Sequence, residues 1–385
     1  MPSGRATHSR AKRAGSRRAR LPGQATAPAT LADIARLAGV VPMTASRAIN
    51  QSGYVSVQVR RRVMRAAQKL NYRPNVLARR LKGQRLRAVG IMLPDIANPF
   101  SAELVAGIQQ ILEAAGYTIF IATSNRSVLQ EKAGLHAFVD HRVDGVVVAT
   151  RGTQIGNETI TELARRRIPV VTVGRPIERS AVDYVTADHW KGSFHAVRHL
   201  IELGHRRIGF LGINHEDSRM LRRFQGYAAA LEAAGLPLIK ELIAGPDGGP
   251  AYATQDDGYN AMLRLAQIRE RPTAVFARND YTAIGAMRAA HEMGLSVPGD
   301  LAIAGFDNIP LAAFATPPLT TVEQPIAAQG RQAARFLLER MEGRYHGKRQ
   351  SVCFDCRLII RGSTNPTTSG TSNLRTLSKV SGGRG

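Results

Sequence analysis

The sequence predicts a small helical domain followed by a larger, two-lobed α/β domain of the doubly wound type. Apolar residues recur at helical spacing between residues 30 and 70, whereas short apolar runs separated by helix-length segments fill residues 88–364. The chain of 385 residues is long enough for two or three domains. The apolar runs form two successive series of strands and helices, so we expect two lobes with a cleft between them.

The first predicted helix follows Thr30. Its apolar residues form one stripe at helical spacing, and Asp33 lies three residues after Thr30, which is close to a capping box. Gly39 follows the stripe and tolerates the left-handed backbone that commonly ends a helix.

A second helix is expected to begin at Pro42, because proline is well accepted in the first turn of a helix. Val41 then occupies the capping position, where its side chain accepts no hydrogen bond. The residues that we expect to face outward are Met43, Thr44, Ser46, Arg47 and Asn50. Two short helices joined by a tight turn fit either a DNA-binding helix-turn-helix or an ordinary helical hairpin.

A third helix is predicted over residues 57–70, with Ser56 as its cap and several arginines on its outer face. These arginines fit either a solvated surface or contacts to nucleic-acid phosphates. Pro74 ends this region, and residues 76–82 could form a helix that is too short to be stable alone.

Positive charge is concentrated at one end of the chain. Residues 1–87 contain 20 Lys and Arg and the single acid Asp33, so they contribute +19 of the formal net charge of +24. A cationic segment joined to a nearly neutral body is typical of proteins that bind a polyanion. We interpret residues 1–29 as a disordered basic arm, and a start codon assigned too far upstream would give the same composition. A secretion signal is not expected, because no apolar segment follows Arg17-Arg18.

The two cysteines do not indicate a disulfide framework, which fits a reducing cytoplasm. Cys353 and Cys356 fall in one predicted strand, where residues three apart face opposite sides, so we expect neither a redox pair nor a metal site. No window approaches 18 consecutive apolar residues, and a membrane partner is therefore not expected.

The predicted core strands are AVGIMLP, YTIFIAT, GVVVAT and IPVVTVG in the first lobe, and RRIGFLGI, LIKELIA, PTAVFA and LAIAGFD in the second. We expect LTTVEQP to return the chain to the first lobe, where a helix over residues 327–341 would pack. No dinucleotide-binding, phosphate-loop or nucleophile-elbow motif accompanies these strands, so neither an enzyme nor a cofactor is expected.

Ligands of doubly wound folds bind beyond the carboxyl ends of the strands, and polar residues follow several of the predicted strands. Asp280 and Asn308 are expected to cap the helices that follow them, because Asp and Asn are favoured capping residues. The residues considered for ligand contacts at these ends include Asp95, Phe100, Asp188, Arg223, Asn279 and Asp307.

TLADIARLAGV, TASRAIN, YVSVQVRRRVMRAAQKLNYRPN and LARRLKG resemble the DNA-binding headpiece of the LacI/GalR family, and the likeness extends from Thr30 to about Thr364. The resemblance implies a periplasmic-binding-protein-like core that binds an effector. It implies domains at residues 30–74 (headpiece), 75–87 (hinge helix and linker) and 88–364 (core), with a disordered tail at 365–385.

By this resemblance the second helix reads DNA. Arg47 is expected to pair with a guanine, Pro42 and Met43 occupy positions that vary with operator preference, and Leu81 of the hinge helix would wedge between base pairs in the minor groove. The expected DNA-contacting residues are Thr30, Pro42, Met43, Thr44, Ser46, Arg47, Asn50, Tyr54, Asn75, Ala78, Leu81 and Lys82.

The resemblance also assigns effector contacts. Phe100 would stack on a sugar ring, and Ser101 stands where many relatives have a second aromatic residue. Arg223 and Asp307 would grip adjacent hydroxyls or a carboxylate of the ligand. The expected effector-site residues are Asp95, Phe100, Asp188, Arg223, Asn279, Asp307 and Gln324. His205 is expected to make a structural hydrogen bond, and Trp190 to pack.

Taken together, these features predict a ligand-responsive transcriptional regulator, acting as a repressor, that binds a palindromic operator as a homodimer in the cytoplasm and at the nucleoid. Its partners would be double-stranded DNA, a second copy of the chain, and a sugar, sugar acid or purine. The alternatives are an enzyme, which lacks a catalytic constellation here, and a transport-associated sugar-binding protein, which would need a signal peptide.

Overall fold

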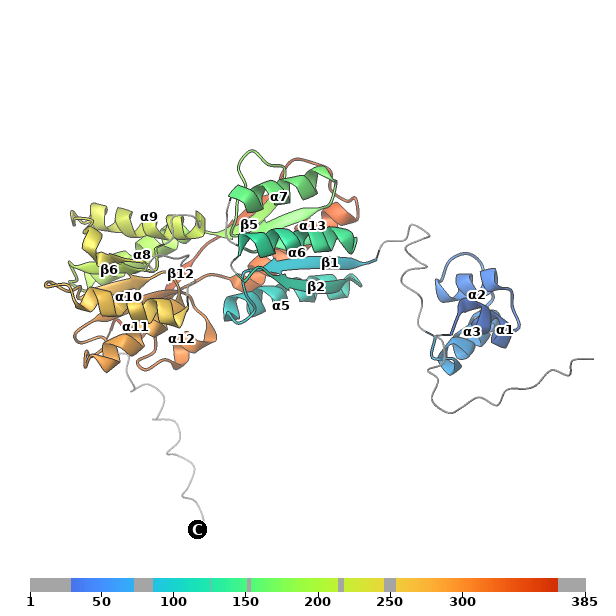
Figure 1. Cartoon of the computed structure of the whole chain (residues 1–385), viewed down its shortest axis with the longest axis horizontal. Coiled ribbons are helices and arrows are strands. Elements are labelled where there is room, and N and C mark those ends of the chain that lie inside the picture. The colour runs from blue at the N-terminus through green and yellow to red at the C-terminus, as the bar shows by residue number, and fades with distance from the viewer. Residues whose placement is uncertain are drawn as a thin grey trace, which may run out of the picture. The chain divides into compact units, whose positions relative to one another are not determined.

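The computed structural model describes residues 29–72, 86–125, 127–150, 154–213, 218–245 and 254–365. The chain forms two compact units, residues 1–83 and 84–385, and we describe each separately (Figure 1). The predicted basic arm, the hinge residues Asn75, Ala78, Leu81 and Lys82, and the predicted tail beyond Asn365 lie outside the described residues.

The first unit contains α1 (Leu31–Ala38), α2 (Pro42–Ile49) and α3 (Val57–Lys69), as predicted. The capping box at Thr30 and Asp33 is present, and Gly39 ends α1 with φ at 62°. Ser56 caps α3, whereas Val41 makes no side-chain hydrogen bond at the start of α2. The three helices bury a small common core made of Ile34, Ala35, Ala38, Ala45, Ala48, Val63 and Ala66.

The second unit is a two-lobed α/β structure with a six-stranded sheet in each lobe, which confirms the predicted fold class. The first sheet has the order β11-β5-β4-β3-β1-β2 and is parallel throughout. Its strands are β1 (Ala88–Leu93), β2 (Thr118–Thr123), β3 (Gly145–Val148), β4 (Val170–Val173), β5 (Asp183–Ala187) and β11 (Ser351–Phe354).

The second sheet has the order β12-β10-β9-β8-β6-β7, and only its edge strand β12 is antiparallel to its neighbour. Its strands are β6 (Ile208–Leu211), β7 (Ile243–Ala244), β8 (Ala274–Ala277), β9 (Ala302–Asp307), β10 (Thr320–Glu323) and β12 (Arg357–Ile359). The predicted strand LIKELIA is mostly a 3-10 turn, Lys240–Leu242, and only its last part pairs as β7.

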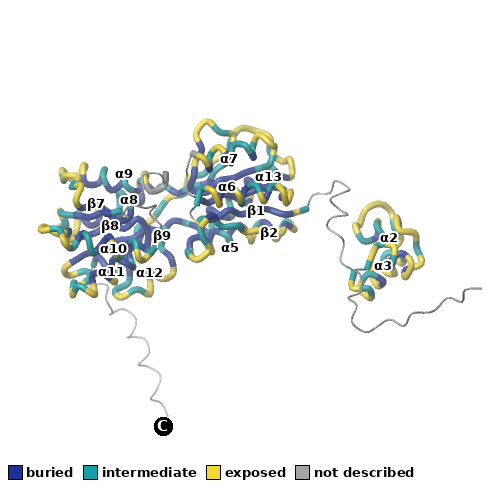
Figure 2. Tube along the Cα trace, viewed as in Figure 1, coloured by how far each residue is buried: buried dark blue, intermediate teal, exposed yellow. Residues whose placement is uncertain are grey.

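Helices cover both faces of each sheet, so the central strands are fully buried (Figure 2). In the first lobe, α5 (Pro99–Ala114) and α13 (Ile326–Met341) cover one face, and α6 (Val128–Asp140) and α7 (Gln154–Arg165) cover the other. In the second lobe the pairs are α8 (His189–Glu202) with α9 (Ser218–Ala233), and α10 (Gln255–Ala266) with α11 (Asp280–Glu292). The short α12 (Pro310–Phe314) follows β9.

The chain passes between the lobes three times: between β5 and α8, between β10 and α13, and between β11 and β12. The return after β10 and the packing of α13 on the first lobe confirm two predictions. The prediction of one strand for residues 351–361 is wrong, because β11 and β12 belong to different sheets. Cys353 therefore lies in one lobe's sheet and Cys356 at the crossing, and both are free thiols.

Strand β2 differs from its prediction as a buried strand. It is the edge strand of the first sheet, with Phe120 51% and Ile121 43% exposed. The sequence suggested burial because β2 is as apolar as the central strands. None of the described helices is long and apolar enough to cross a membrane.

Candidate functional site

A buried ion pair joins Arg223 of α9 to Asp307, the last residue of β9. The Arg223 Nη2 atom lies 3.0 Å from Asp307 Oδ1, and the two side chains are only 4% and 7% exposed. Arg223 also donates through Nη1 to the Arg278 carbonyl and through Nε to His189 Nδ1, at 3.3 Å. Its guanidinium carbon lies 3.7 Å from the centre of the Phe306 ring. Arg223 is thus fixed both by donation in its plane and by stacking on its face.

The backbone at Asp307 is unusual. Asp307 has φ of 115° and Asn308 has φ of 56°, in the region that side-chain-bearing residues rarely adopt. Such a conformation costs about 1–3 kcal/mol per residue and persists only where the surroundings impose it. Asn308 is held by its amide donating to Glu323, at 3.0 Å, and by Arg361 donating to its carbonyl oxygen, at 2.8 Å. In this conformation the Asp307 carboxylate lies against Arg223.

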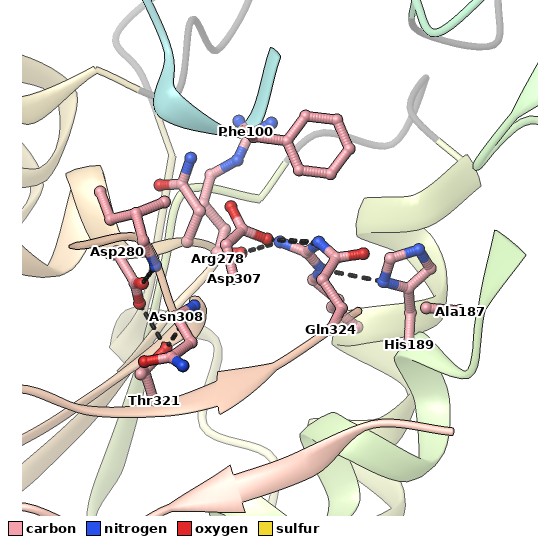
Figure 3. Close-up of polar contacts among 12 residues, drawn as sticks. Phe100, Ala187, His189, Arg278, Asp280, Asp307, Asn308, Thr321 and Gln324 are labelled. Carbon is pink, nitrogen blue, oxygen red and sulfur yellow. Dashed lines mark hydrogen bonds and ion pairs between the residues drawn. The ribbon is translucent and has the colours of Figure 1, made fainter. Parts of the chain in front are cut away.

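Gln324, in the crossing that follows β10, makes a further contact to this carboxylate. Its Nε2 atom donates to Asp307 Oδ1 at 2.6 Å (Figure 3). We call Arg223, Asp307, Gln324, His189 and Arg278 the Arg223–Asp307 cluster. All five residues are buried.

The capping prediction at the start of α11 is wrong. Asn279, not Asp280, is the cap, and its Oδ1 accepts from the Thr282 amide at 2.9 Å. Asp280 is the first helical residue, and its carboxyl accepts from the Ile309 amide at 2.8 Å and from the Thr321 hydroxyl (Figure 3). Burial, followed by the nearby Asp307 charge, raises the pKa of Asp280 well above its usual value.

Asn308 does not cap α12 either. Ile309 stands at that position without a side-chain hydrogen bond, because the Asn308 side chain is engaged by Glu323 and Arg361. Two residues that the sequence marks as helix caps therefore fix the turn beyond β9 instead.

The loop after β1 belongs to the first lobe. Asp95 accepts from the Asn98 amide at 2.8 Å, and Asn98 caps α5 by accepting from the Phe100 amide at 3.0 Å. Phe100 is 9% exposed and Ser101 is completely buried, so the Ser101 side chain is not accessible to a ligand in this structure. The position of Asp95 shows a role in shaping this loop.

Asp188 lies in the crossing between β5 and α8. Its carboxylate caps α8 by accepting from the Lys191 amide at 3.0 Å. Trp190, in the first turn of α8, stacks on Phe194 with ring centres 5.3 Å apart, which confirms the expected packing role. His205 lies 3.0 Å from the Thr273 hydroxyl, as expected for a structural hydrogen bond.

The structure thus brings Arg223, Asp307 and Gln324 into direct contact, and Asn279 follows Arg278 in the chain. Asp95, Phe100 and Asp188 belong to other parts of the fold, namely the loop after β1, the start of α5 and the crossing before α8. Sequence reasoning missed His189 and Arg278. Each is the chain neighbour of a predicted residue, which was the available signal.

The outward face of α2 carries the residues expected to read DNA. Met43 is 62% exposed, Arg47 and Asn50 are exposed, and Thr44 and Ser46 are half-buried. The Asn50 amide donates to the Ser46 hydroxyl at 3.3 Å. Tyr54, just beyond α2, is 92% exposed. Pro42 is exposed in the first turn of α2, whereas the Thr30 hydroxyl is engaged by Asp33 at 2.6 Å.

This unit is also strongly cationic. Helix α3 contains Arg60, Arg61, Arg62, Arg65 and Lys69 and no acid. The one acid of the described headpiece, Asp33, pairs with Arg36 at 3.3 Å. A helix-turn-helix with an exposed second helix and uncompensated positive charge is suited to binding nucleic acid.

A helix-turn-helix unit followed by a two-lobed α/β unit defines a DNA-binding transcriptional regulator with a ligand-binding core. Residues 30–75 match the family model of bacterial regulatory proteins of the lacI family, and residues 197–364 match that of the periplasmic binding protein-like domain.

Curated relatives match along most of the chain. The transcriptional repressor CytR of Escherichia coli K12 is 36% identical over 87% of this chain and 96% of its own length. The regulator DegA of Bacillus subtilis is 33% identical over 88% of this chain and 98% of its own. The chain therefore belongs to the LacI family of bacterial regulatory proteins, whose members are ligand-responsive transcriptional regulators and not enzymes.

Solved structures of other transcriptional regulators share this fold. The Lac repressor dimer bound to its operator and the anti-inducer ONPF superimposes with a TM-score of 0.77 at 26% identity, covering 88% of this chain and 99% of that one. The regulator CelR in complex with cellobiose gives a TM-score of 0.65 at 32% identity, covering 87% of this chain and 99% of that one.

Proposed function

We propose that this protein is a repressor that binds a palindromic operator as a homodimer, with an affinity controlled by a sugar or sugar acid at the Arg223–Asp307 cluster. The observation that carries the proposal is the buried Arg223–Asp307 pair at the carboxyl end of β9, which is held by a strained backbone, the side chains of Gln324 and His189 and the backbone carbonyl of Arg278. Ligands of open α/β folds bind at such ends.

The chemistry of the cluster suits a polyhydroxylated ligand. A carboxylate accepts from two adjacent hydroxyls, and a guanidinium donates to hydroxyl oxygens or, in bidentate fashion, to a carboxylate. Both groups are already buried in the folded chain, so the cost of removing them from water falls on folding and not on binding. Asn279 and Phe100 are proposed as further contacts, with Asp95 and Asp188 as the weakest members of the expected set because each shapes its own loop or helix.

Similar proteins support a small polar effector without fixing its identity. CelR was solved with cellobiose, and a LacI family regulator of Enterococcus faecium with ribose. Relatives named PurR, repressors of Photobacterium profundum and Aliivibrio salmonicida, are 31% identical. We therefore place sugars and sugar acids first and keep purines as the alternative class.

On the DNA side, we propose that Arg47 reads a guanine and that Met43 and Pro42 make apolar contacts. Thr44, Ser46, Asn50 and Tyr54 would fix the position on the backbone. The headpiece at residues 30–74, the hinge at 75–87 and the core at 88–364 remain the proposed domain limits. Binding would occur in the cytoplasm, at the nucleoid.

The edge of the first sheet supports dimerisation. Strand β2 has no neighbour on one side among the described strands, and it exposes Phe120 and Ile121. Exposed edge strands with large apolar residues favour association with another chain. The Lac repressor match is a dimer on DNA, which supports two copies of this chain on a two-fold symmetric site.

The first experiment is binding of the full-length protein to DNA fragments from around its own gene, titrated against salt. Arg47→Ala should weaken binding to the footprinted palindrome about 5-fold to 150-fold, since a bidentate guanine contact contributes roughly 1–3 kcal/mol. The matched control is Arg166→Ala, which removes an exposed arginine paired with Glu162 in the core and should leave binding unchanged. Binding that ignores sequence and both substitutions would contradict the operator model.

The effector is tested on the same operator fragment with D-ribose, cellobiose, D-gluconate and hypoxanthine. One of these classes should shift operator affinity, and Asp307→Asn should abolish the shift while leaving ligand-free operator binding intact. If Asp307→Asn responds like the unsubstituted protein, the Arg223–Asp307 cluster is not the effector site.

A further inference from the structure

A buried glutamine of the first lobe makes contact with the Arg223–Asp307 cluster. Gln329 of α13 donates from Nε2 to Gln324 Oε1 at 3.1 Å, and Gln324 donates from Nε2 to Asp307 Oδ1 at 2.6 Å. Gln329 and Gln324 are 1% and 3% exposed. A continuous hydrogen-bonded path therefore leads from α13, through the crossing after β10, to the carboxylate in the second lobe.

Gln329 differs from its surroundings. The other buried side chains of α13 are apolar, namely Ile326, Ala333, Ala334, Phe336, Leu337, Leu338 and Met341. A buried amide without a partner is unfavourable by at least about 1 kcal/mol, so an apolar residue would be the simpler choice for packing alone. The Gln329 amide instead bonds the Gln324 amide, and the other end of Gln324 donates to Asp307.

Helix α13 holds Gln329 in a fixed place. A Cβ atom at Gly330 would lie 2.4 Å from the Leu104 carbonyl oxygen, and one at Gly107 would lie 2.3 Å from the Ala327 carbonyl oxygen. Helices α5 and α13 therefore meet backbone to backbone, and neither can slide without losing this contact. The donor end of Gln329 is positioned by the packing of the first lobe.

Two partners fix the orientation of Gln324, namely the Gln329 amide and the Asp307 carboxylate. A glutamine amide has an accepting oxygen at one end and a donating nitrogen at the other. Because Gln329 donates and the Asp307 carboxylate accepts, Gln324 turns its oxygen toward α13 and its nitrogen toward Asp307. The opposite orientation would set a carbonyl oxygen against a carboxylate, which is repulsive.

We propose that Gln329 is a positioning residue of the Arg223–Asp307 cluster. It acts through Gln324, fixes the amide that donates to Asp307, and makes the state of that carboxylate depend on the first lobe. The regulatory importance of Gln329 rests on the proposed function, in which the Arg223–Asp307 cluster is the effector site.

The test is a double-mutant cycle on thermal unfolding of the full chain, with Gln329→Met, Asp307→Asn and the double variant. Methionine matches the length of glutamine and removes the donor, whereas asparagine accepts either orientation of Gln324. Gln329→Met should therefore lower Tm less in the Asp307→Asn background, by about 2 °C or more, because the hydrogen-bonded path from residue 329 to residue 307 runs through Gln324. If Gln329→Met does not fold, Gln329→Leu takes its place in the cycle.

Two controls make the result specific. The non-additivity should vanish when Gln324→Leu is present in every variant, and Gln329→Met should be additive with Tyr259→Phe, which lies on α10 of the second lobe. Additive losses in the main cycle, or non-additivity that survives Gln324→Leu, would overturn the proposal. The measurement uses neither DNA nor effector, so its failure is distinct from failure of the proposed function.

Discussion

Tyr281 of α11 donates a hydrogen bond of 3.1 Å to the backbone carbonyl of Ala97, and so connects the second lobe to the loop after the first strand of the first lobe. Burial, followed by the nearby Asp95 charge, raises the pKa of Tyr281, which keeps the phenol a donor at neutral pH. Asp95 in turn fixes the loop by accepting from the Asn98 amide. This hydrogen bond can therefore form only while the two lobes keep their present separation at this point.

Tyr281→Phe should speed hydrogen–deuterium exchange in the segment 94–98. Loss of one hydrogen bond of about 0.5–1.5 kcal/mol corresponds to roughly 2-fold to 12-fold faster exchange. Mass spectrometry of peptic fragments measures this directly. Tyr259→Phe is the matched control, because Tyr259 donates to Glu292 at 2.6 Å within the second lobe. Equal exchange in the two variants would show that the interlobe bond does not hold the loop.

Val41→Ser should stabilise the first unit by about 1 kcal/mol, because serine can accept a hydrogen bond at the start of α2 where valine cannot. Val41 is 63% exposed, so the substitution removes little packing. Exchange protection of the α2 amides in the full chain is the measurement. The reverse change, Thr30→Val, should lower protection of α1 by breaking its capping box. No gain at α2 would count against the start of α2 at Pro42.

Acidification should destabilise the second lobe through its histidines. Burial lowers the pKa of His195, His199 and His205 from the usual 6.5. The unfolded chain then binds protons more readily than the folded protein below pH 6.5, so stability is lost as pH falls and does not change through these groups above about pH 7. His199→Gln, which can still bond the Thr364 hydroxyl, should reduce the fall in Tm between pH 7 and pH 5. An unchanged pH dependence in that variant would contradict a role for His199.

Arg340→Met should destabilise the first lobe by about 3 kcal/mol, because it leaves a buried carboxylate without its cation. Asp183 is 2% exposed and receives two bonds of 2.8 Å from Arg340. The Gln350 amide supplies a third bond, at 2.7 Å. Denaturant unfolding measures the loss. Arg166→Met, which breaks an exposed pair with Glu162, should cost no more than about 0.5 kcal/mol. Similar losses in both variants would show that burial of Asp183 is not the cause.

Much of the fold followed from short-range patterns. The three headpiece helices, their caps at Thr30 and Ser56, and the return of the chain into α13 were predicted, because capping and helical periodicity are local properties. The exposure of β2 and the division of residues 351–359 between two sheets were not, since both depend on strand order, which is set by contacts far apart in the chain.

The residues of the Arg223–Asp307 cluster were predicted only in part. Arg223, Asp307 and Gln324 were predicted from strand ends and from the family resemblance, and the structure brings them together. His189, Arg278 and Gln329 were missed, because a histidine or arginine beside a predicted residue, or a glutamine in a helix, has no distinctive pattern. The capping error at Asp280 arose because Asn279 and Asp280 are adjacent and either could cap α11. In the structure the Asp280 carboxyl accepts hydrogen bonds from Ile309 and Thr321 instead.

The threefold passage of the chain between its lobes sets the order in which they can be finished on the ribosome. The first lobe begins with β1 but needs α13 and β11, which are made only after almost all of the second lobe. Until then its sheet lacks the edge strand β11, and the apolar surface that α13 later covers stays exposed. The lobe that is begun first therefore stays incomplete until almost the end of the chain has been made, and its exposed apolar face has to be tolerated during most of synthesis.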